Sequence, residues 1–369
     1  MSEVKNVDVI TRAKLTLTKY QTLNNLSLAS LSNQYNENSA YFTRTLLWKS
    51  LLLFDRSTFD HSILDNLSLN LRILKQRRKL FDNYLNKEFI IPWNQLSKDS
   101  RFYRNMGFND GQDITTIYRP NRETVLNDPL SANHPEKLQN DKDTLETIIR
   151  DVERLFPQLK NLFINNFENK VKIIEILFVW YKLNNKDYKQ GMHEILGLIF
   201  KSMIEECISP MRKEEFSKDD LMLDIFNLYD LNYLQSDCFS IFQLIISKAY
   251  TNYYDETLLL QESIKFNLKL HELDKFLYHI LITKLKIDSS IWLIRYFRLL
   301  LLRELGLEEG VIIWDKLIAF GSLKSSKLKE PFDMTLLLQY IIMILLWKLK
   351  KQILESDYGE SMYLLLHYP

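Results

Sequence analysis

The 369-residue sequence predicts an all-α protein, and three observations support this prediction. Only eight glycines and eight prolines interrupt the chain, so tight turns are few. Apolar residues recur three and four positions apart, the spacing that places them on one face of a helix. The alternation typical of strands is almost absent, and the one Asp-Gly pair, Asp110-Gly111, lies in a polar segment.

The same periodicity predicts a series of helices that follow a leader. Residues 1–40 are rich in Asn, Ser and Thr and are expected to be partly ordered, so the packed part of the chain should begin near Tyr41. The run 171–181 is apolar on every side, which is typical of a helix in the centre of a bundle. The predicted helices cover 41–54, 69–88, 143–156, 171–181, 191–207, 220–229, 236–249, 256–283, 289–304, 308–320 and 333–354.

Polar segments suggest how these helices are organised. Residues 100–143 form a long polar segment, and loops of such length usually indicate flexibility or function. The segment 209–220 is the best candidate for a boundary. We therefore expect an N-terminal lobe at about 41–210 and a C-terminal lobe at about 220–369, with a shared cleft.

Composition and charge narrow the class of protein. Hydrophobic residues make up 46% and charged residues 26% of the chain, as in a soluble globular protein. The net charge of +1 excludes a global field that would attract nucleic acid. The two cysteines, Cys207 and Cys238, lack the spacing of a zinc site or a disulfide scaffold, which fits a reducing compartment.

Membrane insertion and independent nucleotide binding are not predicted. The N-terminus lacks the apolar stretch of a secretory signal. The most apolar run, 334–347, is shorter than the roughly 20 residues that span a bilayer, so we expect a buried helix. The basic run KQRRK at 75–79 is expected to be a solvated helix face. No phosphate-binding glycine loop is present, and Lys275 stands where a zinc-binding HExxH motif needs its second histidine.

The helix that precedes Pro157 presents a candidate catalytic arginine. On a helical wheel its apolar residues form one stripe, while Arg154 points to the opposite side and Asp151 lies about 60° from it. An aspartate and an arginine three positions apart can pair on a helix surface. Taken alone, such an exposed pair is worth only about 0–1 kcal/mol and indicates no function.

A second candidate lies at the polar turn Tyr188-Lys189-Gln190-Gly191-Met192. Gly191 lets another backbone approach closely, and the turn leads into a helix. The amide of Gln190 could orient a water molecule, since it both donates and accepts hydrogen bonds.

The two segments together resemble the signature motifs of TBC-domain GTPase-activating proteins for Rab GTPases. The first motif, IxxDxxR, is read as Ile148, Asp151 and Arg154, and the second, YxQG, as Tyr188, Gln190 and Gly191. Arg44 to Trp48 and Trp314-Asp315 are similar to two further family motifs. Residues 127–131 (NDPLS) and the phrase KQGMHE, which replaces the commoner CQGMNE, resemble a branch associated with endosomal and Golgi trafficking.

The resemblance, which covers residue 41 to the end, implies a mechanism and a partner. Arg154 would neutralise charge on the nucleotide phosphates and Gln190 would orient the attacking water, with Asp151 steering the arginine and Tyr188 shaping the glutamine loop. His193, Arg150 and Trp48 are weaker candidates for contact with the partner. The GTP-bound Rab would bring both nucleotide and Mg²⁺, so no cofactor or metal of the chain's own is expected. The implied location is cytoplasmic and peripheral at endosomal or Golgi membranes.

Two other functions compete with this interpretation. One is a non-catalytic TBC scaffold that docks a Rab or a coat protein. The other is a membrane-surface protein that uses the basic run 75–79 and the apolar run 334–347.

One position departs from the family pattern. The chain has Leu155 where the family often has Thr, and this difference removes a hydroxyl but no catalytic group.

Overall fold

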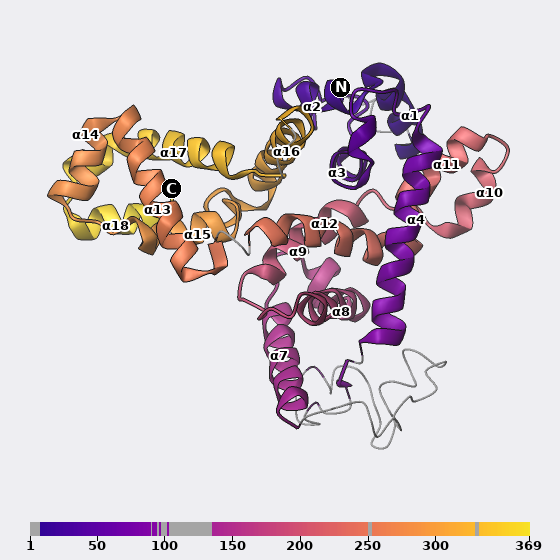
Figure 1. Cartoon of the computed structure of the whole chain (residues 1–369), viewed down its shortest axis with the longest axis horizontal. Helices are drawn as coiled ribbons and strands as arrows, with labels where there is room; N and C mark the ends of the chain where they lie inside the picture. Colours follow the sequence, from indigo (N-terminus) through magenta and orange to yellow (C-terminus); the bar gives the residue numbers. More distant parts are fainter. Residues whose placement is uncertain are drawn as a thin grey trace. The chain divides into compact units, whose positions relative to one another are not determined.

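The computed structural model describes residues 8–89, 91–93, 96, 102, 135–249, 253–328 and 332–369. Within these ranges the regular structure is helical, and extended pairing is limited to two isolated bridges, Thr22–Ser62 and Ile208–Asp230. The all-α prediction is therefore confirmed. Figure 1 labels the helices along the chain.

The chain divides into two compact units. Unit 1 comprises Met1–Leu74, Ser202–Asn232 and Ile241–Pro369, and unit 2 comprises Lys75–Lys201 and Tyr233–Ser240. The two lobes expected from the sequence stay a prediction.

Unit 1 holds both ends of the chain. Its helices are α1 (Val9–Tyr20), α2 (Leu23–Leu31), α3 (Arg44–Leu53), the start of α4 (Leu67–Asn83), α10 (Lys213–Phe216), α11 (Asp220–Tyr229), most of α12 (Leu234–Ala249), α13 (Glu256–Leu273), α14 (Lys275–Tyr278), α15 (Ser289–Arg298), α16 (Leu302–Leu328), α17 (Thr335–Glu355) and α18 (Tyr358–Leu366). Short 3₁₀ turns lie at Arg56–Thr58 and Pro210–Arg212, and a π-helical segment lies at His279–Lys284.

Unit 2 is built around the helices that carry the two signature motifs. It contains the end of α4, α7 (Pro135–Glu153), α8 (Phe167–Asn184), most of α9 (Met192–Ile204) and the start of α12, with π-helical segments at Tyr84–Glu88 and Lys160–Ile164. The apolar run predicted to be central lies in α8, and its residues from Ile173 to Trp180 are buried.

Aspartate side chains begin many of these helices. Asp8, Asp219, Asp255, Asp288 and Asp357 each precede a helix and accept a hydrogen bond from a backbone N–H in its first turn. These N–H groups have no partner inside the helix, so the caps stabilise the helix starts.

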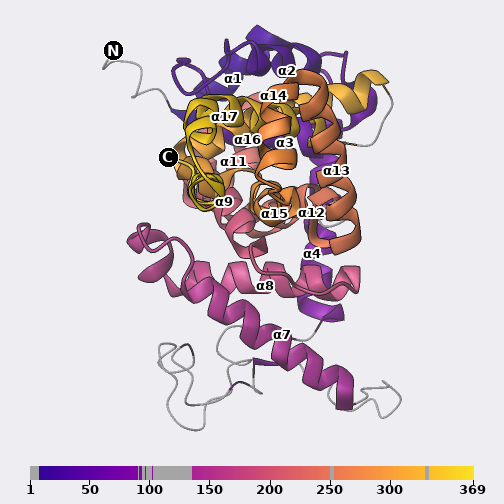
Figure 2. The ribbon, with the colours of Figure 1, turned by 90° about the vertical axis from the view of Figure 1, so that its left-hand side faces the viewer.

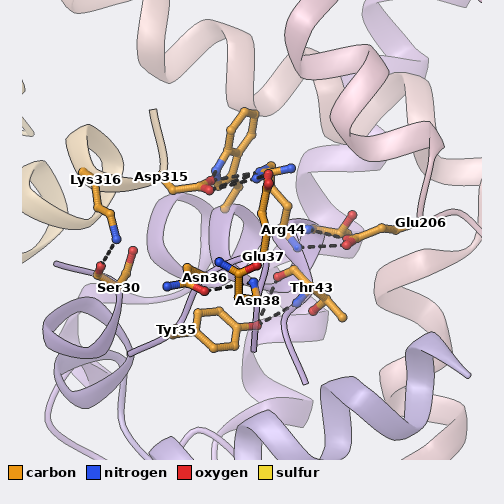
Figure 3. Close-up of polar contacts among 12 residues, drawn as sticks. Ser30, Tyr35, Asn36, Glu37, Asn38, Thr43, Arg44, Glu206, Asp315 and Lys316 are labelled. Atoms are coloured by element: carbon orange, nitrogen blue, oxygen red, sulfur yellow. Dashed lines mark hydrogen bonds and ion pairs between the residues drawn. The ribbon is translucent and has the colours of Figure 1, made fainter. Parts of the chain in front are cut away.

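Helix α3 is held by a polar network within unit 1 (Figure 3). Asp315 of α16 accepts from the Arg44 Nε at 3.1 Å and from the Trp48 indole N–H at 2.7 Å. The carboxylate of Glu206 accepts from the backbone N–H groups of Arg44 at 3.0 Å and of Thr45 at 2.7 Å. A side chain distant in sequence therefore caps α3.

Several boundaries differ from the expectation. Buried side chains of α1, such as Ile10 and Leu17, show that packing begins well before Tyr41. The single helix predicted at 256–283 is interrupted because Asp274 ends α13 and caps α14 through the Leu277 N–H at 2.9 Å. Helix α18 lies beyond the last predicted helix.

Some sequence features lie partly outside the described residues. The segment 127–131 and the Asp110-Gly111 pair are not described, and α7 already begins at Pro135, inside the polar segment 100–143. The boundary segment 209–220 contains the 3₁₀ turn Pro210–Arg212 and α10. The apolar run 334–347 lies mostly in α17, and no helix among the described residues is long and apolar enough to cross a membrane.

The basic run on α4 is only partly solvated. Lys75 and Lys79 are exposed as expected, but Arg78 is buried. Its Nε and Nη2 donate to the two carboxylate oxygens of Asp237, both at 2.8 Å, and its guanidinium lies 3.9 Å from the centre of the Tyr233 ring. The expectation of a solvated face is wrong for Arg78, because a partner 159 residues away neutralises it.

Candidate functional site

Helix α7 delivers Arg154 to the surface of unit 2. The helix ends at Glu153, so Arg154 is the first residue after it rather than a residue inside a helix 143–156. Its side chain is 58% exposed. Phe156 then takes a positive φ of 41°, and Pro157 follows it. A helix rarely continues into the residue before a proline, so the chain turns away directly after the arginine.

The residues that follow Arg154 are tightly packed. Leu155 and Phe156 are buried against Gly197 of α9. A Cβ atom at Gly197 would lie 2.8 Å from Leu155 Cδ1 and 2.9 Å from Phe156 Cε2. The absence of a side chain at Gly197 thus creates the space that these two residues fill. The arginine therefore extends from an anchored segment.

Helix α8 packs against α7 (Figure 2). Lys182 Nζ lies 2.6 Å from Asp141 Oδ2, and the Tyr181 hydroxyl donates to Asp141 Oδ1 at 3.1 Å. The pair is largely buried, so loss of either partner would leave an uncompensated buried charge.

The turn before α9 presents Gln190. Gly191 has a φ of 102°, a conformation that residues with a Cβ rarely adopt. The Met192 N–H donates to the Lys189 carbonyl at 3.2 Å, and the Glu194 N–H donates to the Gly191 carbonyl at 3.0 Å. Gly191 is buried and Gln190 is exposed, so a well-held turn carries an accessible amide.

A single carboxylate joins the two motif segments. Asp151 is buried, and its Oδ1 accepts from the Arg154 guanidinium. Its Oδ2 accepts from the Tyr188 hydroxyl at 2.8 Å. The predicted pairing of Asp151 with Arg154 is confirmed. Ile148, one turn before Asp151, is fully buried and fixes this side of α7 in the core.

The weaker candidates lie in different surroundings. His193 is buried, and its Nδ1 lies 3.0 Å from the Tyr188 hydroxyl oxygen. Arg150 is exposed and donates to Glu146 and Thr147 of its own helix. Trp48 belongs to unit 1 and is completely buried. In this structure neither His193 nor Trp48 has a surface to offer a partner.

Sequence reasoning missed one acidic neighbour of this site. Glu194 is buried, and its Oε1 lies 3.9 Å from His193 Nε2. The position of Glu194 at the end of the phrase KQGMHE was the signal in the sequence that could have identified this residue. Among the described residues, no group of three or more His, Cys, Asp or Glu side chains could hold a metal ion.

Comparison with known proteins identifies the class. A family model for the Rab-GTPase-TBC domain matches residues 92–354, more than half of the chain. The chain belongs to the Rab-GTPase-TBC domain family.

Individual relatives agree with this assignment. Human TBC1 domain family member 5 is 27% identical over 283 residues, which are 67% of this chain and 33% of that protein. Mouse TBC1 domain family member 13 is 27% identical over 212 residues, which are 56% of this chain and 45% of that protein. The chain thus spans only about a third of the length of the first relative and less than half of the length of the second.

A solved structure shares the fold. The crystal structure of the Ypt/Rab-GAP domain of Gyp1p matches with a TM-score of 0.61 and 15% identity, covering 98% of this chain and 92% of that one. At this identity the match concerns the fold alone.

Proposed function

We propose that this chain accelerates GTP hydrolysis on a Rab-family GTPase by supplying Arg154 and Gln190 to the partner's nucleotide site. The observation that carries the proposal is the Asp151 carboxylate, which holds Arg154 through one oxygen and the Tyr188 side of the glutamine turn through the other. Both candidate residues are exposed, yet both extend from anchored segments. Family membership supports the same reaction.

The chemistry needs little more than these two side chains. An arginine supplied in trans accelerates GTP hydrolysis by about 10³–10⁵ through charge stabilisation on the transferring phosphate. A guanidinium has five N–H donors, so pairing with Asp151 leaves donors for phosphate oxygens. The Gln190 amide can accept from and donate to the attacking water. In this proposal GTP and Mg²⁺ come bound to the Rab.

The proposal extends to the cellular setting. The phrase KQGMHE, which resembles the branch of the family associated with endosomal and Golgi trafficking, supports a role in vesicle trafficking at those membranes. The chain would reach these membranes as a peripheral protein through its partners.

The test is phosphate release from a panel of GTP-loaded Rab proteins. At least one Rab should be stimulated, and Arg154→Ala and Arg154→Lys should each lose most of the stimulation, because lysine lacks the planar fork of donors. Gln190→Ala should lose a comparable or smaller part. Arg212→Ala is the matched control, since Arg212 also forms an exposed pair with an acid three residues away, Glu215, and should keep full stimulation.

Two results would contradict the proposal. Stimulation of no Rab in a broad panel would refute it. Full activity of Arg154→Ala would refute the assigned role of the arginine. Nucleotide-independent Rab binding without stimulation would instead favour a non-catalytic scaffold.

A further inference from the structure

The Tyr188 hydroxyl lies between two buried groups that the proposed chemistry does not use directly. Asp151 Oδ2 is 2.8 Å from the hydroxyl oxygen on one side, and His193 Nδ1 is 3.0 Å from it on the other. All three side chains are buried. They come from α7, from the turn before α9 and from the first turn of α9.

Proton counting fixes the direction of these hydrogen bonds. The Asp151 carboxylate accepts from the Arg154 guanidinium through one oxygen and from the Tyr188 hydroxyl through the other, and a carboxylate has no hydrogen of its own to donate. A tyrosine has one proton to donate, so Tyr188 donates it to Asp151. The hydroxyl oxygen is then left as an acceptor towards His193, and Nδ1 must carry the hydrogen.

The imidazole acts through the tyrosine rather than directly on the carboxylate. His193 Nδ1 is 3.5 Å from Asp151 Oδ2, longer than its 3.0 Å distance to the Tyr188 hydroxyl and longer than a normal hydrogen bond. The other ring nitrogen, Nε2, faces Glu194 at 3.9 Å. Among the described residues, Asp151, Tyr188 and Glu194 are titratable groups that lie near the ring.

We infer that His193 is a positioning residue for Arg154. Its Nδ1–H donates to Tyr188, the Tyr188 hydroxyl is thereby oriented towards Asp151, and Asp151 holds the guanidinium. The catalytic consequence rests on the proposed GTPase-activating function, whereas the order of the hydrogen bonds does not.

The same contacts constrain the glutamine turn. Tyr188 precedes Gln190 by two residues and His193 follows it by three. Their hydrogen bond closes the turn from inside, while the bond from Tyr188 to Asp151 attaches it to α7. Loss of the histidine donor should therefore disturb both Arg154 and Gln190.

The first test reads the tautomer and needs no Rab. Nitrogen-15 NMR of the full chain with labelled histidine should show a protonated Nδ1 on His193. In Tyr188→Phe, which removes the acceptor, the proportion of Nδ1–H should fall. An unprotonated Nδ1 in the unaltered chain, or a spectrum unchanged in Tyr188→Phe, would overturn the inference.

The second test compares two substitutions of nearly equal shape. His193→Asn retains an N–H donor, and Asn is the commoner residue in the corresponding family phrase. His193→Asp offers only an acceptor. We expect Asn to keep stimulation within about twofold and Asp to lose about tenfold or more in kcat, with similar affinity for a Rab loaded with a non-hydrolysable GTP analogue. Equal activity of the two variants would refute the positioning role.

A double variant distinguishes loss of the relay from simple misfolding of the His193→Asp protein. Tyr188→Phe removes only the relay hydroxyl and should reduce kcat to a similar extent. If the histidine acts through the tyrosine, adding His193→Asp to Tyr188→Phe should cause little further loss, since coupled residues are not additive. Full additivity would refute the relay. If no Rab is stimulated, the proposed function fails, and the tautomer measurement still decides the hydrogen-bond order.

Discussion

Gly197→Ala should impair catalysis far more than stability. The added Cβ would lie 2.8 Å from Leu155 Cδ1 and 2.9 Å from Phe156 Cε2. Ordinary carbon contacts begin near 3.5 Å, so the two side chains must retreat by about 0.7 Å. They directly follow Arg154, and the displacement should therefore reach the guanidinium.

The expected free energies follow from two opposing effects. Overpacking costs about 1–3 kcal/mol, whereas replacing glycine by alanine inside a helix gains about 1 kcal/mol. The net loss of unfolding free energy should be about 0–2 kcal/mol. A misplacement approaching 1 Å can cost about a hundredfold in rate, so we expect a tenfold to hundredfold loss of Rab-stimulated hydrolysis.

Single-turnover hydrolysis and urea unfolding on the same samples measure both quantities. Gly359→Ala is the control, because its nearest neighbour is Asp357 Oδ1 at 3.5 Å and it lies within α18. That variant should keep full activity and gain stability by up to about 1 kcal/mol. Full activity of a folded Gly197→Ala protein would refute the claim that the packing of Leu155 and Phe156 positions Arg154.

Three further predictions concern Asp237, Gly191 and Tyr35. Asp237→Asn should lower the free energy of unfolding in urea by about 3–5 kcal/mol, because it leaves Arg78 charged and buried. The double variant Arg78→Met with Asp237→Leu should recover most of that loss. Equal stability of the single and the double variant would contradict this prediction. Gly191→Ala should lower the free energy of unfolding by about 1–3 kcal/mol, because alanine is strained at the positive φ of this position, and it should reduce stimulated hydrolysis. An unchanged unfolding midpoint would argue against strain at this position. Burial raises the pKa of Tyr35 from 10 to about 12. Between these two pH values the folded chain keeps a proton that the unfolded chain releases. A stabilisation of about 3 kcal/mol that is present below pH 10 should therefore be lost as the pH rises to 12. Tyr35→Phe should remove this part of the alkaline destabilisation, and an unchanged pH profile would contradict the assignment.

Local periodicity predicted much of the fold and part of the site. The helix expected at 220–229 coincides with α11, and the pairing of Asp151 with Arg154 followed from their spacing. The end of α7 was predicted too late, although Pro157 was a visible signal that the helix must stop before it.

Contacts between distant segments were beyond such reasoning. The partner that buries Arg78 lies 159 residues away, and the bond from Tyr188 to Asp151 spans 37 residues. Helical periodicity indicates which face of a helix is buried but not which element covers it. The functional candidates were found because they match a family motif, and the carboxylate that joins them was visible only in three dimensions.

The bond between Arg44 and Asp315 has a consequence for synthesis of the chain. The two residues are 271 positions apart, and a ribosome that adds about 5–20 residues per second needs roughly 15–55 s to make that interval. Unit 2 is largely one continuous stretch, Lys75–Lys201, which is synthesised within that interval. During the same interval α16 has not yet been synthesised, so apolar side chains of the first helices of unit 1 stay exposed to solvent. Nascent chains of this protein should therefore need chaperone protection chiefly at their N-terminal end.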